Sequence, residues 1–314
     1  MDCIEGAKKH IPDNFVDLII TDPPYGISGD KLHKHYNRNE KHVLEGYIEV
    51  PAKEYAAFSK KWIKQAQRIL RPGGSIYIVS GYTNLIHILN ALAENNLREV
   101  NHLVWKYNFG VYTRNKYISS HYHILYYVKP GAKPTFNTFC RFGAKEKWED
   151  GGSSNYKDRE DVWIINREYK PGKIKNKNQL PSELLMKLIQ YSSNEKDLVC
   201  DLFLGSFSTA KVALGLNRRA IGFEKSRIAY DFGMREIEKI KPGYLLEKLR
   251  KPEISSLPNQ RKRWSIEEKT RLKKRLIELR ITHKHKKTII EILEKEFGRG
   301  SWAIKRILKE IEKG

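Results

Sequence analysis

Hydrophobic and polar positions along the 314-residue chain follow two alternating periods. Short apolar runs that end in turn residues predict buried strands, and apolar residues spaced three and four apart predict helices. The predicted strands cover residues 16–21, 75–80, 103–107, 124–129, 198–203 and 219–224. The predicted helices cover residues 4–10, 53–70, 83–95, 181–192, 206–216 and 228–241. Strands and helices that alternate in this way predict an α/β fold with a parallel sheet and helices on both faces.

Two stretches inside this pattern lack a clear period. Residues 27–50 are polar, basic and rich in His and Tyr, and a loop of that length in a compact domain is usually functional. Residues 130–177 are rich in Gly, Lys, Asn and aromatic side chains. That composition suggests an inserted recognition region more than core. We therefore predict one domain over residues 1–245, with this region of about 130–177 inserted in it.

The end of the chain differs in composition. Residues 246–260 contain prolines and paired serines and are predicted to be a linker, and residues 261–314 hold 18 Lys or Arg and 8 Asp or Glu. Apolar residues in the latter are spaced for two or three short helices, and Ser265 begins a capping-box pattern. We predict a basic helical module with Trp264 and Trp302 in its core, which loosely resembles Myb-like and homeodomain-like DNA-binding modules. The alternative is a charged helical oligomerisation tail.

Charge and cysteine content narrow the class of protein. The formal net charge is +22, from 59 Lys or Arg against 37 Asp or Glu. This excess favours a polyanionic partner, with nucleic acid as the default, and a basic enzyme without such a partner is the alternative. Cys3, Cys140 and Cys200 are too few and too scattered for a disulfide framework or a zinc site. The chain has no run of 18 apolar residues and no signal-peptide pattern, so we expect a cytoplasmic protein without a membrane span.

The sequence Thr21-Asp22-Pro23-Pro24-Tyr25-Gly26 directly follows the first predicted strand. Proline fixes φ and lacks an N–H, so the carbonyls of Asp22 and Pro23 are expected to face outward as acceptors. A planar ligand with an exocyclic amine would be held by these acceptors and would stack on Tyr25. The alternative is a structural turn with a buried Tyr, which the preceding Asp and apolar strand make less favourable.

A second motif follows the predicted strand 198–203. Asp201-Leu202-Phe203-Leu204-Gly205-Ser206 opens a helix, and Gly205 permits a tight turn that brings backbone N–H groups to a ligand. Glu224 ends the next strand, where an acidic residue commonly bonds ribose hydroxyls. This is a generic nucleoside-site signal, with a structural turn as the alternative. A single glycine argues against a nicotinamide cofactor, and the Asp-Pro-Pro-Tyr turn on the same sheet favours S-adenosylmethionine.

Together these motifs resemble the β-class DNA amino-methyltransferases, in which the catalytic tetrapeptide precedes the cofactor motif. The resemblance extends from Asp2 to about Lys241. Three positions depart from the family pattern. Leu202 replaces a turn proline, and Leu180 replaces the Lys of the segment that usually reads His-Pro-Thr-Gln-Lys-Pro. Phe207 replaces the second glycine of the cofactor turn, which either narrows the cofactor pocket or repacks it.

The resemblance implies a Rossmann-like methyltransferase sheet and methyl transfer from S-adenosylmethionine to the exocyclic amine of a flipped base in duplex DNA. An Asp at the first position of the tetrapeptide favours adenine over cytosine. Cytosine C5 chemistry is disfavoured because no cysteine follows a proline. A catalytically weak DNA-binding protein and an RNA or protein amino-methyltransferase are the alternatives. A cognate restriction endonuclease and a second copy of the chain are candidate partners.

The candidate site residues form three groups, and no metal ligand is predicted. The catalytic group is Asp22, Pro23, Pro24 and Tyr25. The cofactor group is Asp2, Cys3, Asp22, Asp201, Phe203, Gly205, Ser206, Ser208, Thr209, Glu224 and Lys225. The DNA-binding group is Lys31, His33, Lys34, His35, Arg38, Lys106, Arg114, Lys116, Arg261, Lys262, Arg263, Lys305 and Arg306.

Overall fold

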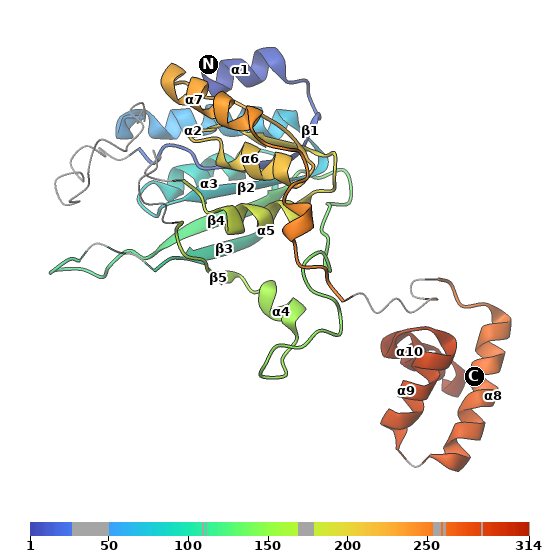
Figure 1. The fold of residues 1–314 in the computed structure, drawn as a ribbon. Coiled ribbons are helices and arrows are strands. Elements are labelled where there is room, and N and C mark those ends of the chain that lie inside the picture. The colour runs from blue at the N-terminus through green and yellow to red at the C-terminus, as the bar shows by residue number, and fades with distance from the viewer. Residues whose placement is uncertain are drawn as a thin grey trace. The chain divides into compact units, whose positions relative to one another are not determined.

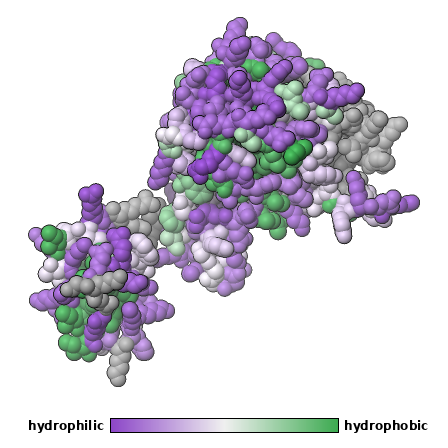
Figure 2. Space-filling view, turned by 180° about the vertical axis from the view of Figure 1, so that it is seen from behind, coloured by the Kyte–Doolittle hydropathy of each residue, from purple (hydrophilic) through white to green (hydrophobic). Residues whose placement is uncertain are grey.

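The computed structural model describes residues 1–26, 50–108, 110, 112–168, 179–253, 259, 262–283 and 285–313. The chain forms two compact units, Met1–Phe142 with Glu146–Pro252, and Gly143–Lys145 with Glu253–Gly314. Six of the predicted DNA-binding residues lie outside the described residues, namely Lys31, His33, Lys34, His35, Arg38 and Arg261. Hydrophilic residues cover most of the face of each unit that is seen in Figure 2, in keeping with the high net charge.

The centre of the larger unit is a sheet in which the described strands lie in the order β5-β3-β4-β2-β1-β6-β7. The strands are β1 (Val16–Thr21), β2 (Leu70–Ser80), β3 (Arg98–Lys106), β4 (His121–Val128), β5 (Val162–Ile164), β6 (Leu198–Asp201) and β7 (Arg219–Gly222). β1 pairs in parallel with both β2 and β6. The carboxyl ends of β1 and β6, which carry the two predicted motifs, are therefore neighbours at one edge.

One strand departs from the predicted parallel arrangement. β4 pairs antiparallel with both β2 and β3, so the expectation of a wholly parallel sheet is wrong there. The described residues between β3 and β4 form no helix, and strands joined without a crossover helix pair antiparallel. β2 also begins earlier than predicted. Arg71–Gly74, which were expected to end the preceding helix, lie within the strand, next to an irregularity in its register with β1.

Helices cover both faces of the sheet, as predicted (Figure 1). On one face pack α1 (Cys3–His10), α2 (Ala52–Ile69) and α3 (Leu85–Ala93). On the other pack α5 (Ser182–Ser192) and α6 (Ser208–Gly215). α7 (Arg227–Glu238) packs against a small apolar cluster at the start of α6, and a short 3-10 helix, η3 (Leu246–Lys248), follows it. No helix of the described residues is long and apolar enough to span a membrane.

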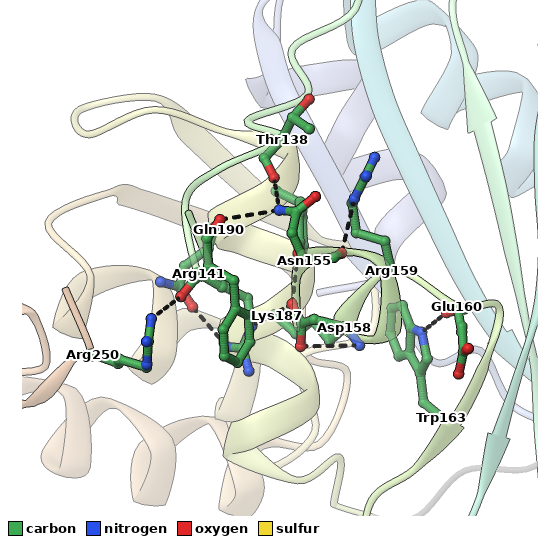
Figure 3. A network of polar contacts seen from close by, with 12 residues as sticks. Thr138, Arg141, Asn155, Asp158, Arg159, Glu160, Trp163, Lys187, Gln190 and Arg250 are labelled. Carbon is green, nitrogen blue, oxygen red and sulfur yellow. Dashed lines mark hydrogen bonds and ion pairs between the residues drawn. The ribbon is translucent and has the colours of Figure 1, made fainter. Parts of the chain in front are cut away.

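The region predicted to be an insertion contributes to the core through β5, which adds to the sheet beside β3 and buries Trp163. The short helix α4 (Ser154–Asp158) precedes it. A polar network joins α4 to α5 (Figure 3). Asp158 accepts hydrogen bonds from Arg141 at 3.0 Å and Tyr191 at 2.6 Å, and lies 3.6 Å from Lys187. This part-buried carboxylate therefore joins the region to α5.

The smaller unit contains α8 (Ile266–Thr282), α9 (Lys286–Phe297) and α10 (Ser301–Lys313), around an apolar core of their own. The predicted capping box at Ser265 is confirmed. Trp264 is half-buried and its ring lies 6.1 Å from that of Phe297. The expectation that Trp302 lies in the core is wrong, because this side chain is 72% exposed on α10.

Candidate active site

The Asp-Pro-Pro-Tyr segment forms a turn at the carboxyl end of β1. The Tyr25 hydroxyl donates to Oδ1 of Asp22 at 2.6 Å. The Asn84 amide donates to the carbonyls of Tyr25 at 2.6 Å and Gly26 at 3.1 Å. Gly26 has a φ of +65°, and a Cβ there would lie 2.6 Å from the Tyr55 ring. The turn is thus held by its own Tyr25–Asp22 hydrogen bond and by the Asn84 amide. A larger residue in place of Gly26 would disrupt it.

Asp22 has an unusual electrostatic setting. It is partly accessible to solvent, but protein surrounds its carboxyl group, and this desolvation raises its pKa to about 7. The nearby charge of Asp201 raises the pKa further, whereas the Tyr25 hydrogen bond and the Arg167 charge lower it. A carboxyl that titrates near neutral pH can accept or release a proton under ordinary conditions.

Aromatic rings gather beside the turn. The Tyr25 ring stacks on Tyr122 of β4, with centroids 5.7 Å apart and planes at 28°. Tyr122 also lies 5.4 Å from Tyr107 and 5.5 Å from Trp105. The Arg167 guanidinium donates to the Tyr122 hydroxyl at 3.0 Å and lies 4.6 Å from the Tyr107 ring centroid. These rings and this cation provide faces on which a planar ligand can stack.

The second predicted motif meets the first through a hydrogen bond between strands. The Thr21 hydroxyl at the end of β1 donates to Oδ1 of Asp201 at the end of β6, at 2.9 Å. The same oxygen accepts from the backbone N–H of Phe203 at 3.0 Å. Burial raises the pKa of Asp201 to about 6, and the charge of Glu224 raises it further. Two carboxyl groups with raised pKa values therefore share one edge of the sheet.

Glu224 holds the glycine turn in place. One of its carboxylate oxygens accepts from the N–H of Gly205 at 2.9 Å, and the other accepts from the N–H of Ser226 at 2.7 Å. The N-terminal ammonium of Met1 donates to the Glu224 carbonyl at 2.5 Å, so α1 begins beside the same turn. The Asp2 carboxylate caps α1 through the N–H of Ile4 at 2.9 Å.

Phe207 packs onto α7, in a small apolar cluster with Leu204 and Ala210. The residue is 3% exposed and has a φ of +63°, a left-handed conformation rare for a bulky side chain. Its ring lies against Gly233, and an added Cβ on Gly233 would be 2.2 Å from it. Its ring also meets Tyr230 edge-on at 5.9 Å. The ring is thus packed against α7, and whether it also narrows the cofactor pocket stays a prediction.

The remaining predicted residues are distributed as follows. Cys3 is buried in the apolar core, where burial raises the pKa of its thiol to about 12. In the cofactor group, Ser206 and Thr209 are buried, Ser208 is half-buried, and Lys225 is exposed. The described residues of the DNA-binding group, Lys106, Arg114, Lys116, Lys262, Arg263, Lys305 and Arg306, are all exposed. Whether each contacts a ligand stays a prediction.

Three residues at the site were missed by the sequence reasoning: Asn84, Tyr122 and Arg167. Each comes from a segment far from the Asp-Pro-Pro-Tyr turn in the sequence, and no local motif marks it. Asn84 follows the carboxyl end of β2, which pairs with β1. Strand order would therefore have placed Asn84 at the correct edge. Tyr122 and Arg167 depend on the antiparallel β4 and on β5, which the hydrophobic pattern alone does not arrange.

Comparisons with known proteins agree with this geometry. The model of a DNA methylase family matches residues 16–234. The Type II methyltransferase M.BamHI of Bacillus amyloliquefaciens is 32% identical over 241 residues, which cover 71% of this chain and 53% of that protein. M.HpaI of Haemophilus parainfluenzae is 31% identical over 226 residues, which cover 69% of this chain and 67% of that protein.

Solved structures share the fold. The M1.HpyAVI complex with S-adenosylmethionine superposes with a TM-score of 0.52 at 24% identity, over 76% of this chain and 96% of that one. The cytosine-N4-specific PvuII DNA methyltransferase has a TM-score of 0.55 at 15% identity, over 80% of this chain and 92% of that one. The fold is thus that of the S-adenosylmethionine-dependent DNA methyltransferases.

The class of protein follows from the sheet, the paired carboxyls and the family match. The chain belongs to the DNA methylase family. It spans about half the length of M.BamHI.

Proposed function

We propose that this protein transfers a methyl group from S-adenosylmethionine to the exocyclic amine of adenine in duplex DNA. The observation that carries this proposal is the Asp22 carboxyl at the end of β1, desolvated and hydrogen-bonded by Tyr25 at 2.6 Å. An amine needs acceptors for its hydrogens and an aromatic face beside it, and the turn supplies both.

The chemistry assigned to Asp22 is to increase the nucleophilicity of the amine. The lone pair of an aromatic amine is delocalised into the ring, so the amine is a poor nucleophile. Hydrogen bonds from its two hydrogens to the Asp22 carboxylate and the Pro23 carbonyl favour a pyramidal nitrogen with a localised lone pair. As the nitrogen–carbon bond forms and the carbon–sulfur bond breaks, the nitrogen becomes cationic and releases one proton. Asp22, with a pKa of about 7, is suited to accept it.

The residues of the β6 and β7 ends fit the proposed cofactor. When bound, S-adenosylmethionine supplies an electrophilic methyl group on a cationic sulfur. Asp201 and Glu224 are carboxyl groups that flank the Gly205 turn, and Glu224 holds that turn through the Gly205 N–H. Each oxygen of Glu224 has lone-pair capacity beyond the single N–H bond that it accepts. The carboxylate can therefore accept from ribose hydroxyls while it fixes the turn.

The target base lies inside a duplex stack, so the proposal requires that it be flipped out. Tyr25 and Tyr122 would stack on the flipped base. The segment between β3 and β4 carries the exposed cations Arg114 and Lys116 beside Tyr117, which is 98% exposed. Cations with an exposed ring suit contact with phosphates and bases. The Type II names of the relatives support a role in a restriction-modification system, with a cognate endonuclease as the partner.

Mass spectrometry of nucleosides tests the proposal. Unmethylated DNA is incubated with the full chain and S-adenosylmethionine, and we expect N6-methyl-2′-deoxyadenosine. N4-methyl-2′-deoxycytidine would keep the mechanism and overturn the choice of base, in line with the cytosine-N4 specificity of the structurally similar PvuII enzyme. No methylated nucleoside from folded protein would overturn the proposal.

A pair of variants assigns the activity to the turn. Asp22→Asn keeps the shape of the side chain and removes its charge, so methyl transfer should be lost while DNA binding is retained. Glu247→Gln removes the charge of an exposed glutamate on η3 and should leave turnover unchanged. Equal turnover of both variants would show that Asp22 has no catalytic role.

A further inference from the structure

The smaller unit presents α10 in a fixed orientation with respect to α8 and α9. The inward residues Ile304, Ile307 and Leu308 of α10 pack into the core that these helices share. α9 and α10 are joined by three residues, of which Gly298 has a φ of +59° and ends α9 in the left-handed conformation. Two helices joined by a short turn that contains glycine form a helix-turn-helix arrangement.

Arg299 fixes the turn between these helices. The residue is 3% exposed, and its guanidinium donates to the carbonyls of Asn259, Lys262 and Arg263 at 3.2, 2.6 and 3.1 Å. It also pairs with Glu268 at 2.7 Å and lies 4.2 Å from the Trp264 ring centroid. This buried cation joins the turn to the segment before α8, so the turn from which α10 begins is held in place.

The outward face of α10 is basic and aromatic. Trp302, Lys305, Arg306 and Lys309 are all exposed, and their spacing places them on one side of the helix. The Arg306 guanidinium lies 5.3 Å from the Trp302 ring centroid. Two acidic residues border this face: Glu310 pairs with Lys269 at 3.2 Å and lies 3.9 Å from Arg306, and Glu294 accepts from the N–H of Ser301 at 2.6 Å.

This face matches the chemistry of DNA. An indole that is 72% exposed leaves a large apolar surface in water, which marks an interaction site when cations surround it. The partner must therefore be anionic and must offer apolar or aromatic surface. Residues 261–314 carry 18 Lys or Arg and 8 Asp or Glu. An excess of this size favours a nucleic acid, with its regular row of phosphates, over an acidic peptide. The major groove of duplex DNA is wide enough to admit one α-helix.

We propose that α10 lies in the major groove of duplex DNA, where it forms a second DNA-binding site in addition to the methyl-transfer site. Lys305, Arg306 and Lys309 contact phosphates on either side of the groove, and Trp302 packs against a sugar or a base edge. The site rests on the proposed function only in that DNA is the shared ligand. It gives the chain affinity for DNA outside the base that is methylated.

Salt-dependent DNA binding by the full chain tests this site. Binding of a labelled duplex of about 30 base pairs is followed by fluorescence anisotropy over about 50–200 mM salt, without cofactor. Each phosphate contact contributes about 0.9 to the slope of log K against log salt. The triple variant Lys305→Ala, Arg306→Ala, Lys309→Ala should therefore make that negative slope shallower by about 2.7.

A charge-matched control separates a defined site from general charge. The triple variant Lys273→Ala, Lys274→Ala, Lys295→Ala removes the same charge from exposed positions on α8 and α9, and its slope should change by less than about 1. Equal losses in both variants would overturn the site, because DNA would then respond only to net charge. An unchanged slope in the α10 variant would also overturn it.

Trp302→Ala distinguishes the apolar contact from the ionic contacts. It should weaken binding at least about fivefold while the salt slope is unchanged, and full affinity would remove Trp302 from the site. The readout is binding without turnover, so a chain that fails to methylate DNA but loses slope only in the α10 variant would refute the proposed function and support this site. Circular dichroism of each variant confirms that the helices remain folded.

Discussion

Gly233→Ala is the substitution whose effect the structure predicts most sharply. In a helix interior such as that of α7, replacing Gly by Ala ordinarily stabilises by roughly 0.5–1 kcal/mol. Here the new Cβ would lie 2.2 Å from Cδ2 and 2.4 Å from Cε2 of Phe207. Contacts that short cannot persist, so the Phe207 ring must move or the helix must shift. We therefore expect the opposite sign, a destabilisation.

The magnitude follows from what the Phe207 ring loses. Overpacking a filled core costs about 1–3 kcal/mol, and the ring is 3% exposed in the native structure. Its backbone, at φ +63°, is held in the left-handed region against a penalty of about 1–2 kcal/mol, and the packing of the ring offsets that penalty. Displacing the ring also disturbs the Gly205 turn two residues away, so the affinity for S-adenosylmethionine should fall about tenfold or more.

A double-mutant cycle with Phe207→Gly tests the cause. Phe207→Gly removes both the ring and the left-handed penalty, so Gly233→Ala should become neutral or stabilising in that background. Urea unfolding gives the stability and calorimetry gives the cofactor affinity of all four proteins. If Gly233→Ala costs the same free energy with and without the Phe207 ring, the packing argument is wrong.

Three further predictions concern ionisable groups. The pKa of Asp22 is about 7, so kcat/KM should fall about tenfold per pH unit below pH 7. The folded-state pKa lies above the unfolded one, so the free energy of unfolding should decline as pH rises from about 4 to 7. Asp201, whose pKa is also raised, keeps part of that decline in Asp22→Asn. A smaller decline in Asp22→Asn than in the wild type would bear this out, and identical declines would refute it. Asp158→Asn leaves Lys187 buried without its carboxylate, so urea unfolding should show a loss of about 3 kcal/mol. The exposed Glu247→Gln should show no measurable loss, and equal stabilities of the two variants would contradict this. Arg299→Ala should increase hydrogen exchange in α10 without affecting the larger unit, and an unchanged exchange rate would show that the Arg299 contacts are dispensable.

The parts of the fold that follow local periodicity were predictable from the sequence. The strand before Asp22 and the helix over 52–69 bury residues at the spacing that their backbone geometry dictates. Placement of Asp22 and Asp201 at one edge also followed, because parallel strands meet at their carboxyl ends. These predictions needed only the period of the apolar residues and the identity of the turn residues.

The features that the sequence did not reveal depend on contacts between distant segments. β5 is three residues long, too short to show a period, and it is a strand only because β3 offers a free edge. Trp302 was expected inside because tryptophan is large and apolar, but its position on α10 faces opposite to Ile304, Ile307 and Leu308. The amphipathic pattern of that helix contained this information. Its charged positions at 305, 306 and 309 share the side of Trp302, and they outweigh the average preference of the residue type.

The hydrogen bond between Thr21 and Asp201 holds the Asp-Pro-Pro-Tyr turn close to Asp201, so the charges of Asp22 and Asp201 affect each other. The charge of Asp201 raises the pKa of Asp22, so each carboxylate opposes the ionisation of the other. A cation bound at this edge would relieve that repulsion and favour the ionised form of Asp22. By linkage, ionised Asp22 would then favour the cation to the same extent. The proposed cofactor would carry a cationic sulfonium before methyl transfer and a neutral thioether after it, so only the first form would have this advantage. The same pair of carboxyls would therefore favour the substrate form of the cofactor over its product. It would also couple cofactor binding to the charge on Asp22, which we propose holds the amine.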